Sequence, residues 1–222
     1  MIPLRDENAT SYVPIATILI ITANIAVFAY QAYFGPRGFE RYVFQLGLVP
    51  SALTGSAPLL GPRPMIAPWL TVGTSMFMHG GLMHLLMNMW FLWIFGDNIE
   101  CALGRGRFLV FYLLCGIGAA LVHAALTPTS TVPLVGASGA IAGILGAYFL
   151  LFPFHRISTL IFIFFFVRVV PIPAFFFLGF WFLLQVLQSR MGGPVAWWAH
   201  IGGFLVGMIF VGVFLRQKRR SP

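Results

Sequence analysis

The sequence of 222 residues predicts an all-α, polytopic membrane protein in which a bundle of six helices crosses the bilayer. Three observations support this fold class: the composition, the lengths of the apolar runs, and the distribution of basic residues. The composition is 59% hydrophobic and 8% charged, whereas a soluble domain carries about 25% charged residues. So few charges could not cover a surface that faces water. The length suits one compact domain, and we expect residues 1–222 to form a single domain.

Apolar runs of the length that a bilayer crossing requires, roughly 20 residues, recur along the chain. We expect six crossing helices, at residues 15–34, 76–95, 108–126, 134–154, 174–187 and 197–215. The stretch 158–167 is rich in Ile and Phe but too short to span, and Arg168, Pro171 and Pro173 follow it. We therefore expect this stretch to be interfacial or re-entrant.

The basic residues predict the orientation of the chain. Six crossings place both termini on one side, and we place that side in the cytoplasm. Nine of the 13 Lys and Arg residues then lie inside: Arg5, Arg105, Arg107, Arg156, Arg168, Arg216, Lys218, Arg219 and Arg220. The other four lie outside: Arg37, Arg41, Arg63 and Arg190. This excess inside predicts cytoplasmic N- and C-termini.

The segments between and beyond the helices have distinct predicted roles. We expect a short cytoplasmic N-terminus at 1–11 and a basic cytoplasmic tail at 216–222, which fits anionic lipid better than nucleic acid. A bacterial inner membrane is the predicted location, with an organelle membrane as the alternative. The long outer loop 35–75 has apolar patches, and we expect it to lie on or in the outer leaflet.

Polar residues inside predicted membrane helices mark a candidate site, because such groups are costly in lipid and usually functional. His84 and Asn88 lie one turn apart on one face in the outer half of the second helix. Ser138 lies about one turn into the fourth helix, and His200 about one turn into the sixth. These three helices run in the same direction across the membrane. The four polar side chains therefore occupy one outer layer.

The surroundings of Ser138 favour nucleophilic chemistry. Ser138 lies in the segment Val135–Gly139, which opens a helix. Its backbone N–H is therefore among the first in that helix and lacks an intrahelical partner, and the helix dipole there favours negative charge. Small residues repeat every three or four positions on the fourth and sixth helices and allow close packing: Gly139, Gly143, Gly146, Ala199, Gly203 and Gly207. None of the five acidic residues lies in the outer half of a predicted membrane helix. A Ser-His dyad is therefore expected, without a carboxylate.

At these residues the sequence resembles the rhomboid family of intramembrane serine proteases. The resemblance covers roughly residues 69–210 and rests on three motifs in order on the expected helices. These are Gly136-Ala137-Ser138-Gly139, which matches the family's GxSG, Ala199-His200-Ile201-Gly202-Gly203, and His84-x-x-x-Asn88.

The resemblance implies a function and a role for each site residue. Ser138 would be the nucleophile and His200 the general base and then general acid. The Ser138 N–H, Asn88 and His84 would form the oxyanion hole. The fifth helix and the loop after it, including 191–195, would form a substrate gate and cap, with these candidate residues: Phe176, Phe180, Trp181 and Met191. The substrates would be membrane-anchored proteins cut in or near a transmembrane segment. No cofactor or metal is expected, and the sequence does not indicate an oligomeric state.

Two alternatives stay open at this point. A catalytically inactive rhomboid-like protein would bind transmembrane helices without cutting them, although such proteins typically lack the Ser or His that this chain has. A small transporter would call for an inverted repeat or midplane polar residues, and the sequence has neither pattern. Many relatives also place an aromatic residue one turn after the serine, against the histidine. This chain has Ala142 there, so the sequence does not identify what orients His200.

Overall fold

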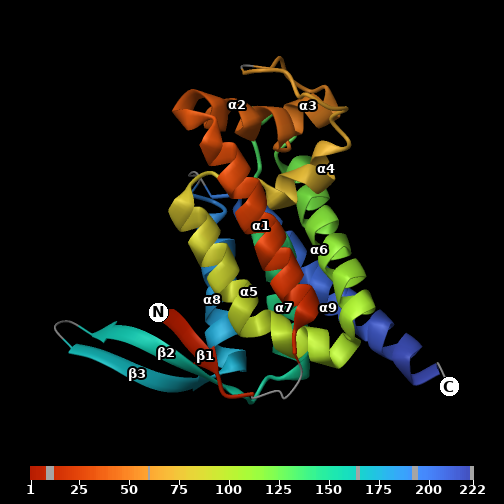
Figure 1. The fold of residues 1–222 in the computed structure, drawn as a ribbon. Helices are drawn as coiled ribbons and strands as arrows, with labels where there is room; N and C mark the ends of the chain where they lie inside the picture. The colour runs from red at the N-terminus through yellow and green to blue at the C-terminus, as the bar shows by residue number, and fades with distance from the viewer. Residues whose placement is uncertain (9–12, 60, 164–165, 192–194, 221–222) are drawn as a thin grey trace.

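The computed structural model describes residues 1–222 except 9–12, 60, 164–165, 192–194 and 221–222, and it describes only the backbone of 163, 166 and 216–220. Within the described residues, six helices of at least 14 residues stand together as a bundle (Figure 1). They are α1 (Ile15–Tyr33), α5 (Leu82–Leu103), α6 (Arg105–Leu126), α7 (Ser138–Leu151), α8 (Ala174–Gln188) and α9 (Trp197–Arg220). The N-terminal strand and the last turns of α9 lie at the same end of this bundle (Figure 1).

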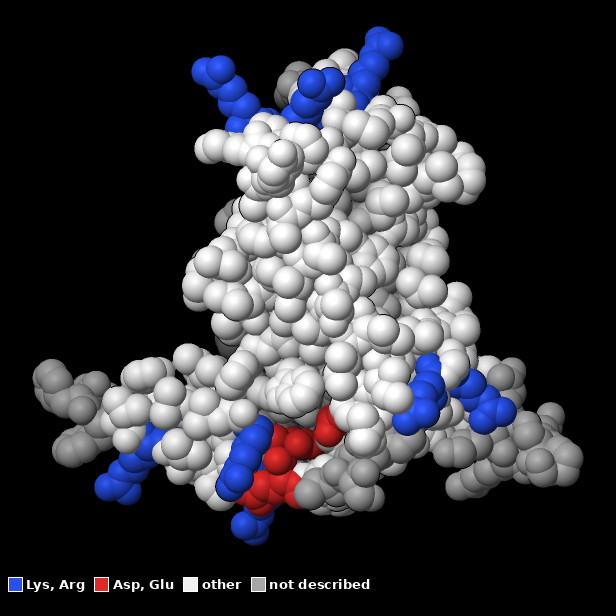
Figure 2. Space-filling model, in the orientation of Figure 1, with Lys and Arg blue, Asp and Glu red and all other residues white. Residues whose placement is uncertain are grey.

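The surface of the bundle is that of an integral membrane protein. In the view of Figure 2, Lys and Arg gather at both ends, Asp and Glu are seen at the sheet end, and the band between the ends is uncharged. Three of the described helices are long and apolar enough to cross a membrane: α1, α6 and the Trp197–Leu215 part of α9. α7 and α8 are apolar but have only 14 and 15 residues. The predicted count of six crossings is therefore not confirmed.

The helix boundaries differ from the predicted ones where loop contacts compete with the helix. α5 begins at Leu82 rather than at residue 76, because Met78 and Gly81 are extended after the short helix η1 (Ser75–Phe77). α7 begins at Ser138 rather than at residue 134, because Leu134 exchanges two backbone hydrogen bonds with Leu48. α9 continues to Arg220, so residues 216–220 are helical rather than a separate tail.

A three-stranded antiparallel sheet corrects the prediction of an all-α fold, although the chain is mostly helical. Its strands are β1 (Ile2–Asp6), β2 (Arg156–Ile163) and β3 (Phe166–Pro173), in the order β1-β2-β3. β-branched residues such as Ile157 and Val169 favour strands, and Pro171 and Pro173 exclude a helix. The described residues of the stretch that we expected to be interfacial or re-entrant, 158–163 and 166–167, are thus paired in antiparallel strands. The predicted short N-terminus is likewise not a free tail, because β1 pairs with β2.

The predicted outer loop contains helices of its own at the end of the bundle opposite the sheet (Figure 1). They are α2 (Gly35–Leu46), α3 (Pro50–Thr54) and α4 (Thr71–Thr74). Tyr33, Phe34, Met65 and Trp69 are exposed here. Exposed aromatic and apolar side chains fit the headgroup region of a bilayer. The location of this segment in the outer leaflet remains a prediction.

α7 is the central helix of the bundle. It packs against α5, α6, α8 and α9, and every residue from Gly139 to Tyr148 is buried. Its contact with α9 is backbone to backbone, as the small residues predicted. A methyl group added to Gly203 would collide with the carbonyl oxygen of Gly139, and one added to Gly207 with that of Gly143. This close approach brings the start of α7 beside the start of α9.

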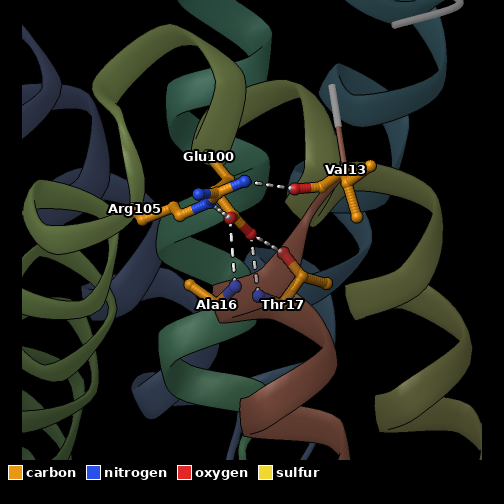
Figure 3. A network of polar contacts seen from close by, with 5 residues as sticks. All are labelled: Val13, Ala16, Thr17, Glu100 and Arg105. Carbon is orange, nitrogen blue, oxygen red and sulfur yellow. Dashed lines mark hydrogen bonds and ion pairs between the residues drawn. The ribbon is translucent and has the colours of Figure 1, made fainter. Parts of the chain in front are cut away.

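A buried carboxylate joins α1 to α5 at the sheet end of the bundle (Figure 3). Glu100 is fully buried and accepts hydrogen bonds from the Ala16 N–H (3.0 Å), the Thr17 N–H (2.8 Å) and the Thr17 hydroxyl (2.8 Å). The Arg105 guanidinium lies 4.0 Å from it. Because α1 has no side-chain N-cap of its own, Glu100 satisfies the N–H groups of its first turn.

A second polar cluster ties β1 to the bundle at the same end. The Asp6 carboxylate accepts hydrogen bonds from the Asn98 side-chain amide (2.6 Å) and the Tyr148 hydroxyl (2.8 Å). Burial raises the pKa of Asp6 above its ordinary value. Asp97, two residues past the predicted span 76–95, has a pKa raised to about 6 by burial and by the charge of Asp6.

Candidate active site

The turn before α7 sets the direction of Ser138. Gly136 has φ 117°, a left-handed conformation that favours glycine, and its N–H donates to the Ser75 carbonyl (2.9 Å). A methyl group added to Gly136 would lie 2.8 Å from the His84 imidazole, so this position also lacks room for a side chain. Two residues later Ser138 opens α7, with its N–H among those that have no intrahelical acceptor.

The serine and the histidine meet as the sequence predicts. The Ser138 Oγ lies 2.9 Å from His200 Nε2, a hydrogen-bond distance, although 62 residues separate the two in the chain. His200 lies in the first turn of α9, which the glycine contacts hold against α7. This arrangement allows the imidazole to accept the hydroxyl proton.

The other ring nitrogen of His200 has a partner that the sequence analysis missed. His200 Nδ1 lies 2.8 Å from the Oε1 of Gln185, a residue of α8 that is 5% exposed. The side-chain amide nitrogen of Gln185 donates in turn to the Trp181 carbonyl, 3.1 Å away. The sequence signal for this residue was a glutamine inside the otherwise apolar predicted span 174–187, because polar groups in membrane helices usually have a function.

An aromatic ring supports His200 from α8. The Trp181 ring lies with its centroid 5.9 Å from that of His200, at an interplanar angle of 34°. The residue one turn after the serine, Ala142, is fully buried and offers no ring. α8 thus provides both the ring beside the imidazole and the acceptor for its Nδ1.

His84 and Asn88 lie in the first two turns of α5. The Gly80 N–H donates to His84 Nδ1 (3.3 Å), so Nδ1 is an acceptor and Nε2 carries the proton of the neutral ring. That Nε2 is on the side of Gly136, next to Ser138. The Asn88 side-chain amide donates to the His84 carbonyl (2.7 Å), and its Oδ1 has no hydrogen-bond partner among the described residues.

A cavity of about 520 Å³ brings five of the predicted site residues together. Its lining includes Ser138, His200, His84, Asn88 and Trp181.

The other three predicted site residues do not line this cavity. Phe176, Phe180 and Met191 are 65%, 46% and 83% exposed. Of the loop that we expected to cap the site, residues 192–194 lie outside the described residues, whereas Val195 lines the cavity. The gate and cap roles remain predictions.

Known proteins and one family model match the part of the chain that contains this cavity. A family model described as the Rhomboid domain matches residues 67–217. Rhomboid protein 1, mitochondrial, from Saccharomyces cerevisiae is 34% identical over 163 residues, which cover 68% of this chain and 44% of that protein. Presenilin-associated rhomboid-like protein A, mitochondrial, from Danio rerio is 30% identical over 158 residues, covering 67% of this chain and 39% of that protein.

A bacterial relative matches over a shorter stretch. Rhomboid protease GluP from Bacillus subtilis is 40% identical over 79 residues, which cover 36% of this chain and 15% of that protein. The chain therefore spans less than half the length of each of these three relatives.

Proposed function

Because this chain belongs to the rhomboid family, we propose that it is an intramembrane serine endopeptidase that cuts membrane-anchored proteins in or near a transmembrane segment. The observation that carries the proposal is the distance of 2.9 Å between the Ser138 Oγ and His200 Nε2. Their cavity is also lined by His84 and Asn88, which supply hydrogen-bond donors beside the nucleophile. Nucleophile, base and donors are the three groups that acyl transfer requires.

The first half of the reaction forms an acyl-enzyme. Ser138 Oγ attacks the carbonyl carbon of the scissile peptide while its proton passes to His200 Nε2. The new Oγ–C bond gives a tetrahedral intermediate with a negatively charged oxygen. When the C–N bond breaks, the protonated His200 returns the proton to the leaving amine.

The oxyanion is stabilised at the junction of α5 and α7. The N–H of Ser138 lies at the start of α7, where the helix dipole favours negative charge. His84 Nε2–H and the second hydrogen of the Asn88 amide are the side-chain donors on the α5 side. Each such donor is worth on the order of 10²–10³ in kcat.

The second half of the reaction hydrolyses the acyl-enzyme. His200 takes a proton from water, the hydroxide adds to the acyl carbon, and the Oγ–C bond breaks as the proton returns to Ser138. In the proposed topology, water enters the cavity from the outer side, because Ser138 lies at the end of α7 away from the sheet.

The proposed topology is six crossings with the sheet on the basic, inner side. α7 has 14 residues and a length of about 21 Å, whereas the hydrocarbon core of a bilayer is about 30 Å thick. With its sheet end at the inner boundary of the core, α7 begins about 9 Å below the outer boundary. The nucleophile therefore lies within the bilayer at a depth that water can reach.

The relatives point to two candidate membranes for this protein, the bacterial inner membrane and an organelle membrane. Two of the three relatives reported above carry mitochondrial names and one is bacterial. They do not favour the bacterial inner membrane over an organelle membrane. In either membrane the proposed orientation is the same, with the sheet and both termini on the side of the positive excess.

Cleavage of a membrane-anchored model substrate by the chain in proteoliposomes tests the proposal. We expect Ser138→Ala and His200→Ala each to abolish cleavage while the variants unfold at the same temperature as the parent chain. Cleavage by Ser138→Ala near the parental rate would refute the proposal. Substrate binding without cleavage by the parent chain would instead identify an inactive rhomboid-like binder.

A further inference from the structure

We propose that Gln185 is a positioning residue of the active site, which selects the tautomer of His200 and fixes the direction of its ring. The inference deepens the proposed peptidase function and rests on it. Its starting point is the distance of 2.8 Å between Gln185 Oε1 and His200 Nδ1. His200 thereby has a partner at each ring nitrogen, Ser138 at Nε2 and Gln185 at Nδ1.

The orientation of the Gln185 amide is fixed by its second hydrogen bond. Its nitrogen lies 3.1 Å from the Trp181 carbonyl oxygen, which can only accept a hydrogen bond. A flipped amide would place two acceptor oxygens against each other. Oε1 therefore faces His200, and because an amide oxygen cannot donate, Nδ1 must carry the proton.

This proton assignment prepares His200 for its role. A neutral imidazole that is protonated at Nδ1 has its lone pair at Nε2, where the Ser138 hydroxyl proton arrives. When Nε2 is protonated in the transition state, the Nδ1–H remains bound to Oε1, and the hydrogen bond strengthens because its donor is now cationic. Gln185 thus occupies the place that a carboxylate has in a Ser-His-Asp triad, without a buried negative charge.

The position of Gln185 in the fold favours a role at the dyad over a role in general packing. It is 5% exposed and lies one turn after Trp181, whose ring is beside the same imidazole. α8 packs on α7 and α9, while Phe176 and Leu187 on the same helix are exposed. Because Gln185 is on α8, a displacement of α8 from α9 would separate Oε1 from Nδ1. The full rate of hydrolysis therefore requires α8 in its packed position.

Two substitutions and a matched control test the inference. Gln185→Leu keeps the approximate side-chain volume and removes the acceptor oxygen. Gln185→Glu keeps an acceptor oxygen on a side chain of the same length. Gln188→Leu is the control, because it makes the same change on the same helix, three residues away, at a half-buried position. Each variant is assayed with a transmembrane substrate, with a short soluble peptide, and over a range of pH.

We expect Gln185→Leu to lower kcat for both substrates on the order of 10- to 100-fold, with KM within about twofold. A gate residue would instead affect the transmembrane substrate and spare the soluble peptide. Gln185→Glu should retain more kcat than Gln185→Leu and move the acid limb of its pH profile upward, because a carboxylate favours the imidazolium. Gln188→Leu should keep the parental kcat and pH profile.

The two proposals fail in different ways. If the parent chain cuts neither substrate, the proposed peptidase function is refuted, and so is the role of Gln185 that rests on it. If the parent chain is active and Gln185→Leu has the parental kcat and pH profile, the positioning role is refuted while the peptidase function stands. If Gln185→Leu does not fold, Gln185→Glu is the test. An unchanged pH profile in Gln185→Glu would also refute the positioning role.

Discussion

Replacing Glu100 by alanine or glutamine tests whether the fold depends on one carboxylate at the sheet end of the bundle. Glu100 accepts three hydrogen bonds from the first turn of α1, and both it and Thr17 are fully buried (Figure 3). Water cannot easily replace these contacts. The network is remote from Ser138, because Glu100 lies 16 residues, or roughly four and a half turns, after His84 near the opposite end of α5.

The expected loss of stability follows from the groups left without a partner. Glu100→Ala leaves two buried N–H groups, Ala16 and Thr17, each costing about 1–3 kcal/mol. It also removes the ion pair with Arg105, which adds little because the Arg105 side chain is half exposed. We expect a loss of about 3–5 kcal/mol for Glu100→Ala and about 2–3 kcal/mol for Glu100→Gln, which keeps one acceptor oxygen.

The measurement is the free energy of unfolding in mild detergent, obtained by titration with a denaturing detergent and followed by tryptophan fluorescence. Glu40→Gln is the control, because Glu40 is exposed on α2, and we expect it to change stability by less than about 0.5 kcal/mol. If Glu100→Gln were as stable as Glu40→Gln, the reasoning from buried hydrogen bonds would be wrong. The folded fraction of each variant should keep the parental kcat, since the network does not touch the dyad.

Three further predictions concern packing, the turn before α7, and pH. Gly203→Val should abolish activity and lower the unfolding temperature by more than 10 °C, because its side chain collides with the Gly139 carbonyl; a calorimetric scan that matches the parent would contradict the backbone contact. Gly136→Ala should lower kcat at least tenfold, since the added methyl group presses on His84 in a left-handed conformation, and a parental turnover number would rule this out. Asp97 has a folded pKa of about 6, above the ordinary 3.8, so its contribution to stability is fully present below pH 3.8 and is lost as pH rises through 6. The unfolding temperature of Asp97→Asn should therefore fall less than the parental one between pH 4 and pH 7, and parallel curves would refute the shift.

The helical core was predictable because its signals are local. α1 and α8 begin at the predicted residues, since an apolar run bounded by proline needs no tertiary information. The close contact of α7 and α9 was predictable from glycine spacing, because small residues repeated every three or four positions on one helix face allow a second helix to pack closely. Ser138 and His200 were predictable as a pair, since each lies near the start of its helix and the two helices run in the same direction across the membrane.

The sheet and the partner of His200 were not predicted, because both depend on contacts that are distant in sequence. β1 becomes a strand only by pairing with β2 about 150 residues later, and its five residues have no decisive pattern alone. Gln185 is a polar residue of α8, and the sequence does not determine how α8 is rotated about its axis or, therefore, which neighbour Gln185 faces. The sequence predicted a dyad without a carboxylate and identified no other partner for His200, because the contact with Gln185 depends on the packing of α8 on α9.

The most direct measurement of the central claim is the labelling of Ser138 by a fluorophosphonate in lipid bilayers, read as the mass of the modified peptide. The Ser138–His200 contact predicts rapid labelling of Ser138 in the parent chain, none in Ser138→Ala, and labelling in His200→Ala slowed by at least 100-fold. Labelling of Ser138 at equal rates with and without His200 would contradict the account, because the serine would then react without its base.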